Sequence, residues 1–312
     1  MTPSPSGTGR GVLGLVPVDP TPGLPVPLGL HELGGVPLVC RAVRALAGSG
    51  VVTAITVVVP AGLADRVERL VLPATGRTAT DHRVGVRVLG VVRAGPAAVA
   101  VALAGTDGRL PDLVVVHSPE HPLVTPAAVR RVVAALPAGR DGAGSGAGAG
   151  GGVPAAALPV REVTDTLKRV DLRDRITGTV DRERHGIVGS PQVYQVDRLL
   201  RVLPVTGAAE VEETIGAAGN AGAGAAEAGP LPAATLDVLP SLLLRAGEPV
   251  VTVPEPPGDV RVVTVADLAL AEAVLAVGDD GPERDRSRDS RLRAAGGDGA
   301  VPRRPGRGPR DR

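Results

Sequence analysis

The sequence predicts an α/β fold with a doubly wound, mostly parallel sheet, and three features support this. Short valine-rich runs alternate with amphipathic stretches through the first half of the chain. Tyr194 is the single aromatic residue, so valine, leucine and alanine must build the interior. Such side chains suit a parallel sheet that is covered on both faces. Strand–helix alternation also implies right-handed crossovers between parallel strands.

Strands are expected where β-branched residues cluster between turn signals. These clusters lie at 11–18, 51–59, 84–92, 113–116 and 153–160. Helices are expected between and after these strands. The first would place Val36, Val39, Val43 and Leu46 on one face. The others are expected at 61–72, at 97–104, from 126 onward and at 265–277.

Two of the expected helices carry clear start signals. Thr125 is a plausible N-cap, and Pro126 fits the first helical position, where no backbone N–H is needed. Thr264 and Asp267 form a capping-box-like pair before the last helix.

Composition excludes several classes of function. The net charge is +1, so no overall field favours nucleic acid. Cys40 is the only cysteine, which excludes a disulfide framework and a thiolate metal cluster, and we expect it to be a small buried hydrophobic residue. No long apolar run predicts a membrane span, and the first residues do not resemble a signal peptide. We therefore expect a cytoplasmic protein with no nucleic-acid or membrane partner.

The domain organisation follows from the low-complexity segments. Residues 1–10 and the Arg-rich tail 278–312 are expected to be disordered, and 11–277 to form a single domain. The Gly/Ala-rich stretches 139–152 and 217–229 are expected to be flexible insertions into that domain. The Gly34–Gly35 pair lacks the spacing of a phosphate loop and predicts a turn.

In a doubly wound sheet, ligands bind beyond the carboxyl ends of the strands. These ends lie near 17–19, 90–93 and 117–121. His117 and His121 have a spacing that zinc uses on a helix, but Pro119 and Pro122 disfavour a helix there, so we expect no metal bound by this pair.

Five segments, taken in order, resemble the 2-C-methyl-D-erythritol 4-phosphate cytidylyltransferase family. LVVVHSPEHP (113–122) resembles the family's strand and loop ending in His-Asp-Ala-Ala-Arg-Pro, and AAALPVREVTDTLKRV (155–170) resembles its segment ending in Asp-Thr-x-Lys. TVDR (179–182), SPQ (190–192) and DVRVVTVADLALAEAVL (259–275) resemble its TxxR, Thr-Pro-Gln and closing segments.

The resemblance implies transfer of CMP from CTP to 2-C-methyl-D-erythritol 4-phosphate, with Mg²⁺ if the chain is active. It also implies a β-arm at about 160–190 that crosses into a second subunit, giving a homodimer, or a heterodimer with an intact paralogue. Such chemistry depends on positioning and charge neutralisation. On the acceptor side, the resemblance assigns phosphate positioning to Thr166, Arg182 and Arg261, the last in place of a lysine.

The donor side departs from the family pattern. The Gly-rich triphosphate loop is replaced by VPVDPTPGLPVPL (16–28), in which Pro17 and Gly23 are remnants and Leu28 occupies the catalytic lysine's place. Proline offers no N–H donor to a phosphate. The transition-state arginine has no counterpart. His117 keeps the family histidine, whereas Ser118 replaces the aspartate expected to hold Mg²⁺, which leaves no metal ligand assigned.

Three functions remain open from the sequence. The first is the family's cytidylyl transfer with a rearranged loop. The second is a catalytically inactive sugar-phosphate-binding or dimer-partner subunit. The third is a nucleotidyltransferase for another nucleotide or sugar phosphate, because a fold does not fix a substrate.

Overall fold

The computed structural model describes residues 11–73, 84–92, 95–106, 110–136, 153–203, 235–255 and 258–279. The contacts divide the chain into two units, Met1–Ala271 and Glu272–Arg312. This boundary lies inside the last helix rather than after it. The sheet and the candidate site both belong to the first unit.

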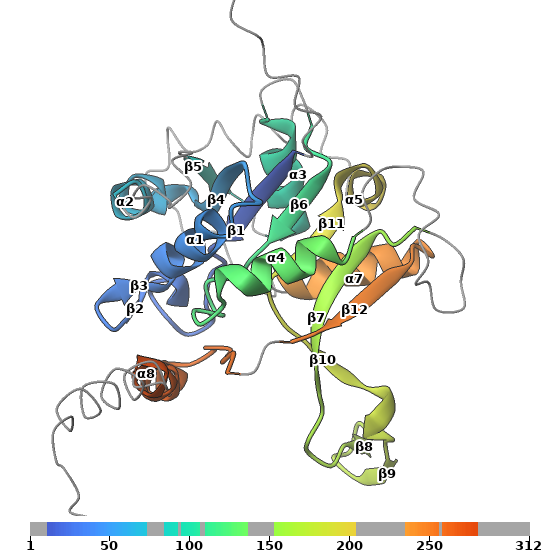
Figure 1. Cartoon of the computed structure of the whole chain (residues 1–312). Helices are drawn as coiled ribbons and strands as arrows, with labels where there is room; N and C mark the ends of the chain where they lie inside the picture. The colour runs from blue at the N-terminus through green and yellow to red at the C-terminus, as the bar shows by residue number, and fades with distance from the viewer. Residues whose placement is uncertain are drawn as a thin grey trace, which may run out of the picture. The chain divides into compact units, whose positions relative to one another are not determined.

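The first unit is built on an eight-stranded sheet whose path runs β10-β7-β11-β6-β1-β4-β5, with β12 also paired to β7 (Figure 1). Neighbours among β1, β4, β5 and β6 are parallel, as are β7 and β12, whereas β10 and β11 run antiparallel to their neighbours. The strands are β1 (Val12–Pro17), β4 (Ala54–Pro60), β5 (Gly85–Val91), β6 (Leu113–Val116), β7 (Ala156–Glu162), β10 (Gly186–Val188), β11 (Gln192–Gln195) and β12 (Val250–Pro254). The predicted fold class is confirmed.

Helices cover both faces of this sheet. Residues along β1 alternate between two buried clusters, because successive side chains of a strand point to opposite faces. Val12 and Val16 join the cluster under α1, α2 and α4, whereas Leu13 and Leu15 join the one under α3, α5 and α7. The helices are α1 (Leu38–Gly48), α2 (Ala64–Val71), α3 (Pro96–Ala104), α4 (Pro126–Ala134), α5 (Val196–Val202), α7 (Thr235–Arg245) and α8 (Val265–Asp279).

The start of the first helix differs from the prediction. Val36 belongs to β3 (Val36–Pro37), which pairs antiparallel with β2 (Glu32–Leu33), and α1 begins only at Leu38. The turn between these strands is the predicted Gly34–Gly35 pair, with φ of 56° and 71°. Two successive left-handed residues are what a tight hairpin turn requires, and glycine adopts them without strain. The hairpin therefore takes Val36 away from the helix.

Both predicted helix starts are confirmed. Thr125 Oγ1 accepts a hydrogen bond from the Ala128 N–H at 3.3 Å, with Pro126 at the first turn of α4. Thr264 and Asp267 bond reciprocally, because Asp267 Oδ2 accepts from the Thr264 N–H at 2.8 Å while Thr264 Oγ1 accepts from the Asp267 N–H at 3.3 Å. Cys40 is free and buried, as expected.

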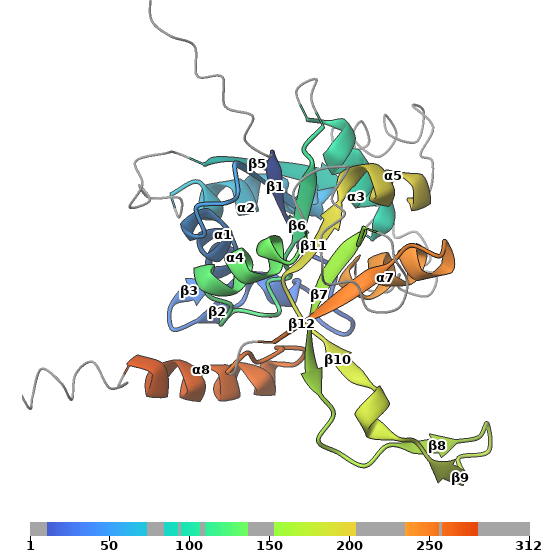
Figure 2. The same cartoon turned by 45° about the vertical axis from the view of Figure 1, so that its right-hand side comes forward.

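A narrow arm leaves the sheet between β7 and β10 (Figure 2). It carries a two-stranded hairpin, β8 (Lys168–Val170) with β9 (Ile176–Thr179), followed by a 3₁₀ turn at Arg182–Arg184. Several apolar side chains on the arm are exposed: Val170 by 53%, Leu172 by 106% and Ile176 by 68%. This side of the arm is therefore uncovered in the single chain.

The predicted insertions 139–152 and 217–229 and the predicted terminus 1–10 lie outside the described residues. Of the predicted tail 278–312, Gly278 and Asp279 belong to α8, and the remainder also lies outside. None of the helices described is long and apolar enough to cross a membrane.

Candidate functional site

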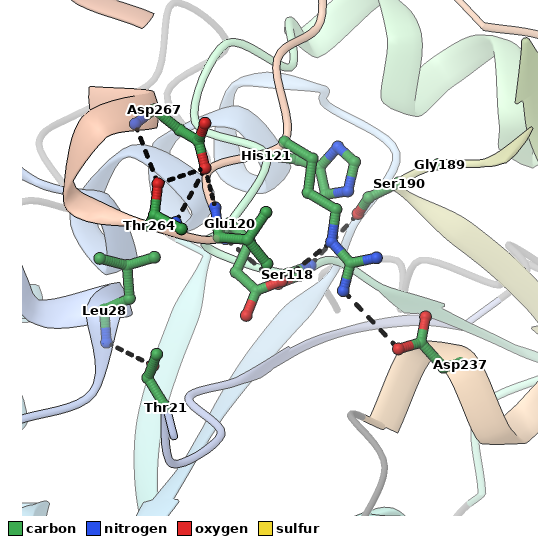
Figure 3. A network of polar contacts seen from close by, with 12 residues as sticks. Thr21, Leu28, Ser118, Glu120, His121, Gly189, Ser190, Asp237, Thr264 and Asp267 are labelled. Carbon is green, nitrogen blue, oxygen red and sulfur yellow. Dashed lines mark hydrogen bonds and ion pairs between the residues drawn. The ribbon is translucent and has the colours of Figure 1, made fainter. Parts of the chain in front are cut away.

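The candidate site lies at the edge of the sheet where β1, β6 and β12 end and β11 begins. Because β11 runs antiparallel to β6, the start of β11 lies at the edge where β6 ends. Pro17 closes β1, His117 and Ser118 follow β6, Ser190 precedes β11, and Glu255 follows β12. Figure 3 labels Ser118 and Ser190, which a hydrogen bond joins, together with Glu120 and His121 of the same loop. Sequence reasoning placed ligand binding at this kind of edge.

His117 is fixed by the residue before β11. Its Nδ1 lies 2.8 Å from Ser190 Oγ, which also accepts the Ser118 N–H at 3.2 Å. Its ring is fully buried, and Nε2 has no hydrogen-bond partner among the residues that the structure describes. Burial and the neighbouring His121 lower the pKa of His117 to about 3, against a smaller opposing effect of Asp259. His117 is therefore a neutral imidazole that fixes the loop after β6.

Arg261 lies between two acidic side chains. Its Nε donates to Glu120 Oε2 at 3.1 Å, and its NH2 lies 3.6 Å from Asp237 Oδ2 on α7. The backbone supports this contact, because the Val262 N–H donates to the Glu120 carbonyl at 2.7 Å. Arg261 is 36% exposed. The guanidinium is thus held at the carboxyl edge with part of its surface open to an anion.

His121 belongs to a second cluster, with two carboxylates from the end of β12. Its Nδ1 lies 2.6 Å from Asp259 Oδ2, and the ligand atoms of His121, Glu255 and Asp259 all lie within 4.8 Å of one another. Burial, followed by the neighbouring Asp259 carboxylate, raises the pKa of Glu255. Sequence reasoning missed Glu255 and Asp259, because more than 130 positions separate them from His121.

The donor side of the edge is apolar and nearly closed. A cavity of about 60 Å³ is lined by the ends of β1, β4 and β5, including Pro17 and Asp19. This volume holds about two water molecules, whereas pockets for small molecules are on the order of 300 Å³ or more. Leu28 is fully buried, and its N–H donates to Thr21 Oγ1 at 2.8 Å. Gly23, with φ of 76°, lies in an exposed turn.

The acceptor side is larger and polar. A groove of about 830 Å³ runs along the ends of β7 and β12 and the base of the arm, lined by Arg161, Thr164, Glu183, His185 and Glu255 among others. Thr166 and Arg182 lie on the arm and are exposed, and Arg182 NH1 donates to the Thr164 carbonyl. No contact within the described residues joins either of them to Arg261. The single chain therefore does not bring the three predicted phosphate ligands together.

The residues at the predicted metal position do not fit Mg²⁺. Ser118 offers a neutral hydroxyl where the resemblance places a carboxylate, and its Oγ accepts the Glu120 N–H at 3.1 Å. Magnesium in proteins is usually bound through one or two carboxylates together with substrate phosphates. Ser118 therefore gives this chain no ligand of the preferred kind at that place.

Comparisons with known proteins agree with the order of these elements. A 2-C-methyl-D-erythritol 4-phosphate cytidylyltransferase of Saccharopolyspora erythraea is 32% identical over 256 residues, covering 81% of this chain and 93% of that protein. One of the same name from Nocardia farcinica is 33% identical over 249 residues, covering 80% and 86%.

Solved structures show the same fold. The crystal structure of 4-diphosphocytidyl-2C-methyl-D-erythritol synthase from Anaerococcus prevotii superimposes with a TM-score of 0.59 at 14% identity, covering 86% of this chain and 99% of that one. Residues 24–277 match the family described as IspD, 2-C-methyl-D-erythritol 4-phosphate cytidylyltransferase, so this chain belongs to that family.

Proposed function

We propose that this chain transfers CMP from CTP to 2-C-methyl-D-erythritol 4-phosphate, in the non-mevalonate route to isoprenoid precursors and in the cytoplasm. A phosphate oxygen of the acceptor attacks the α-phosphorus of CTP, and the bond to the β-phosphate breaks to release pyrophosphate. The main support is the placement of His117, Ser190 and Arg261 at the carboxyl edge of a sheet whose fold superimposes on that of a solved 4-diphosphocytidyl-2C-methyl-D-erythritol synthase.

The acceptor phosphate would meet Arg261 first. A guanidinium offers several N–H donors in a planar arrangement that matches a phosphate group. Glu120 and Asp237 hold Arg261 in place before the substrate arrives, which lowers the entropy that binding must overcome. Arg261 therefore supplies positioning rather than bond making.

The donor side has fewer cations, so we expect slow catalysis. Leu28 is buried, and Pro17 and its neighbouring prolines offer no N–H to a triphosphate. Loss of one contact to the developing charge costs on the order of a hundredfold in rate or more. Ser118 offers no carboxylate to Mg²⁺, so the proposal assigns no step to a metal held by this chain.

As part of the same proposal, two copies of the chain share each site. The exposed apolar side chains Val170, Leu172 and Ile176 support burial of the arm against a second subunit. The arm of one copy would then bring Thr166 and Arg182 to the Arg261 of the other.

The reaction is tested with the purified chain, CTP, 2-C-methyl-D-erythritol 4-phosphate and Mg²⁺. We expect release of pyrophosphate that requires both substrates, together with the cytidine diphosphate product. Release that is no greater than in a reaction without protein would overturn the proposal. Product from another nucleotide but none from CTP would replace it with a different nucleotidyltransferase.

Sharing of the site is tested by mixing two impaired variants at a sugar-phosphate concentration far below the wild-type KM. Arg182→Ala and Arg261→Ala each damage every site of their own dimer. After subunit exchange, half of the dimers hold one intact site, so we expect about a quarter of the wild-type rate. A mixture no more active than either variant alone would show that both residues act from one chain.

A second function is favoured by the burial of Leu28. A subunit without donor-side cations could bind the acceptor phosphate and lend Thr166 and Arg182 to a catalytically complete partner. It predicts thermal stabilisation by the sugar phosphate but not by CTP, and no pyrophosphate from the chain alone. Stabilisation by CTP would exclude this second function.

A further inference from the structure

We propose that His121, Glu255 and Asp259 bind a divalent transition-metal ion, with Zn²⁺ as the reference ion. The three side chains come from the loop after β6 and from the end of β12, and their ligand atoms lie within 4.8 Å of one another. Their side chains are nearly covered, with exposures of 7%, 6% and 2% respectively, although the residues Glu255 and Asp259 as a whole are of intermediate burial. The inference rests on this geometry alone and does not depend on the proposed reaction.

The distances require only a small adjustment on binding. Zinc bonds to nitrogen and carboxylate oxygen are about 2.1 Å, so the ligand atoms of a tetrahedral site lie about 3.4 Å apart. His121 Nδ1 and Asp259 Oδ2 are already closer than this, at 2.6 Å. The third ligand, from Glu255, would move inward, and water or a substrate oxygen would complete the coordination.

An unpartnered atom points independently to a ligand. Asp259 Oδ1 is buried and accepts no hydrogen bond from the described part of the chain, although the other oxygen of the same carboxylate contacts His121. A buried carboxylate oxygen without a partner is costly. A cation between the two carboxylates would satisfy this oxygen, because a metal ion accepts its lone pair.

The balance of charge supports a divalent cation. Glu255 and Asp259 are two carboxylates at close range, and within the described residues their ion pairs are with His121 and with Arg161, which lies 3.7 Å from Glu255 Oε2. Arg161 is half exposed, so solvent weakens its effect. A divalent ion would neutralise both carboxylates and leave the imidazole neutral. Buried charges are normally either paired or bound to metals.

The mixture of donors selects the class of ion. Imidazole suits zinc and other first-row transition metals, whereas oxygen-only sites suit magnesium and calcium. Gly189 gives the site room: a Cβ at that position would lie 1.8 Å from Glu255 Oε1. The absence of a side chain at residue 189 thus lets the Glu255 carboxylate turn toward His121.

The test is a calorimetric titration of Zn²⁺ into the full-length chain after treatment with a chelator. We expect one equivalent to bind, and binding to weaken roughly tenfold or more in Glu255→Gln and in Asp259→Asn. Asp237→Asn is the matched control, because it removes a carboxylate from the same edge of the sheet and leaves the cluster intact. Equal zinc affinity in wild type and Asp259→Asn, or an equal loss in Asp237→Asn, would overturn the proposal.

Melting temperatures separate binding from folding. Each amide variant removes a buried charge at constant shape, so we expect the metal-free variants to melt at or above the wild-type temperature. Zinc should then raise the melting temperature of the wild type and leave that of the variants unchanged.

Co²⁺ gives a readout that needs no variant. Cobalt bound by the wild-type chain with four or five ligands absorbs visible light strongly, and added Zn²⁺ should abolish that band. The weak spectrum of the hydrated ion would contradict the site.

Discussion

The donor and acceptor sides of the same sheet edge differ in size, polarity and fixed charge. The described residues of the donor side line a cavity of about 60 Å³ between Pro17, Asp19 and the ends of two valine-rich strands, whereas the acceptor side opens into a more polar groove of about 830 Å³. Leu28 is buried on the first side, and the Arg261 side chain is 36% exposed at the same sheet edge. The difference shows that the two sides of one sheet edge offer very different room and polarity to a ligand.

The largest effect is expected from returning a lysine to the donor side. Leu28→Lys places an ammonium group at a position with 0% exposure, which either buries a charge or forces it to lose its proton. We expect a loss of about 3 kcal/mol or more in the free energy of unfolding, measured by urea denaturation. Leu244→Lys, at a site 60% exposed, is the control and should change stability by less than about 0.5 kcal/mol. Equal tolerance of both changes would show that the donor loop is not part of the core.

The next effect concerns the acceptor side, at Gly189. In Gly189→Ala the new methyl group would overlap the Glu255 carboxylate, which is 6% exposed and has little room to move. We expect a destabilisation of about 1–3 kcal/mol and a loss of zinc binding. Gly178→Ala is the matched control, because no atom lies within 4 Å of a Cβ there, and its effect should be within about 0.5 kcal/mol. If Gly178→Ala lost zinc binding while Gly189→Ala kept it, the role of Gly189 would be contradicted.

His117 links the candidate site to pH. Its folded-state pKa is about 3, below the ordinary 6.5, so the unfolded chain takes up a proton first as the pH falls. Its contribution is complete above pH 6.5 and is lost as the pH falls toward 3, with a slope of up to about 1.4 kcal/mol per pH unit. His121 and Asp259 face His117 and influence its pKa. Because both also belong to the proposed zinc site, the measurement is made with a chelator present. His117→Asn should remove most of this slope between pH 6.5 and 4, and an unchanged slope would assign the proton uptake elsewhere.

The smallest effect is expected on the arm. Arg182→Ala should raise the KM for the sugar phosphate about tenfold with little change in kcat, because a positioning contact stabilises substrate and transition state alike. Arg184→Ala, on the same 3₁₀ turn and also exposed, is the control and should leave both constants unchanged. A fall in kcat at constant KM would instead make Arg182 part of the reacting centre.

The sequence predicted the sheet and its helices well where the signals are local. The strand at 113–116 and the helix that begins after Thr125 lie where predicted, because valine runs and N-caps act over a few residues. Helices α5 and α7 and the strands β10 to β12 were not specified in advance, since their lengths and pairings depend on distant partners. The carboxyl edge was predicted from topology, which places His117 and Ser118 there whatever their neighbours.

Clusters that join distant residues could not be predicted. Asp259 contacts His121 across 138 positions, and Arg261 contacts Glu120 across 141. The pairing of β12 with β7 and the backbone contact of Val262 with Glu120 help to bring these segments together. His117 and His121 are close in sequence, yet their hydrogen bonds lie in two different clusters, one with Ser190 and one with Asp259.

The most direct test of the difference between the two sides is steady-state release of pyrophosphate from CTP and 2-C-methyl-D-erythritol 4-phosphate. If the acceptor side is retained and the donor side has lost its cations, release requires both substrates, falls about tenfold or more in Arg261→Ala when the sugar phosphate is below its KM, and has a kcat about a hundredfold below the roughly 10 s⁻¹ of a typical enzyme. A kcat near that typical value would contradict the account of the donor side. Pyrophosphate release that is undiminished in Arg261→Ala would contradict the account of the acceptor side.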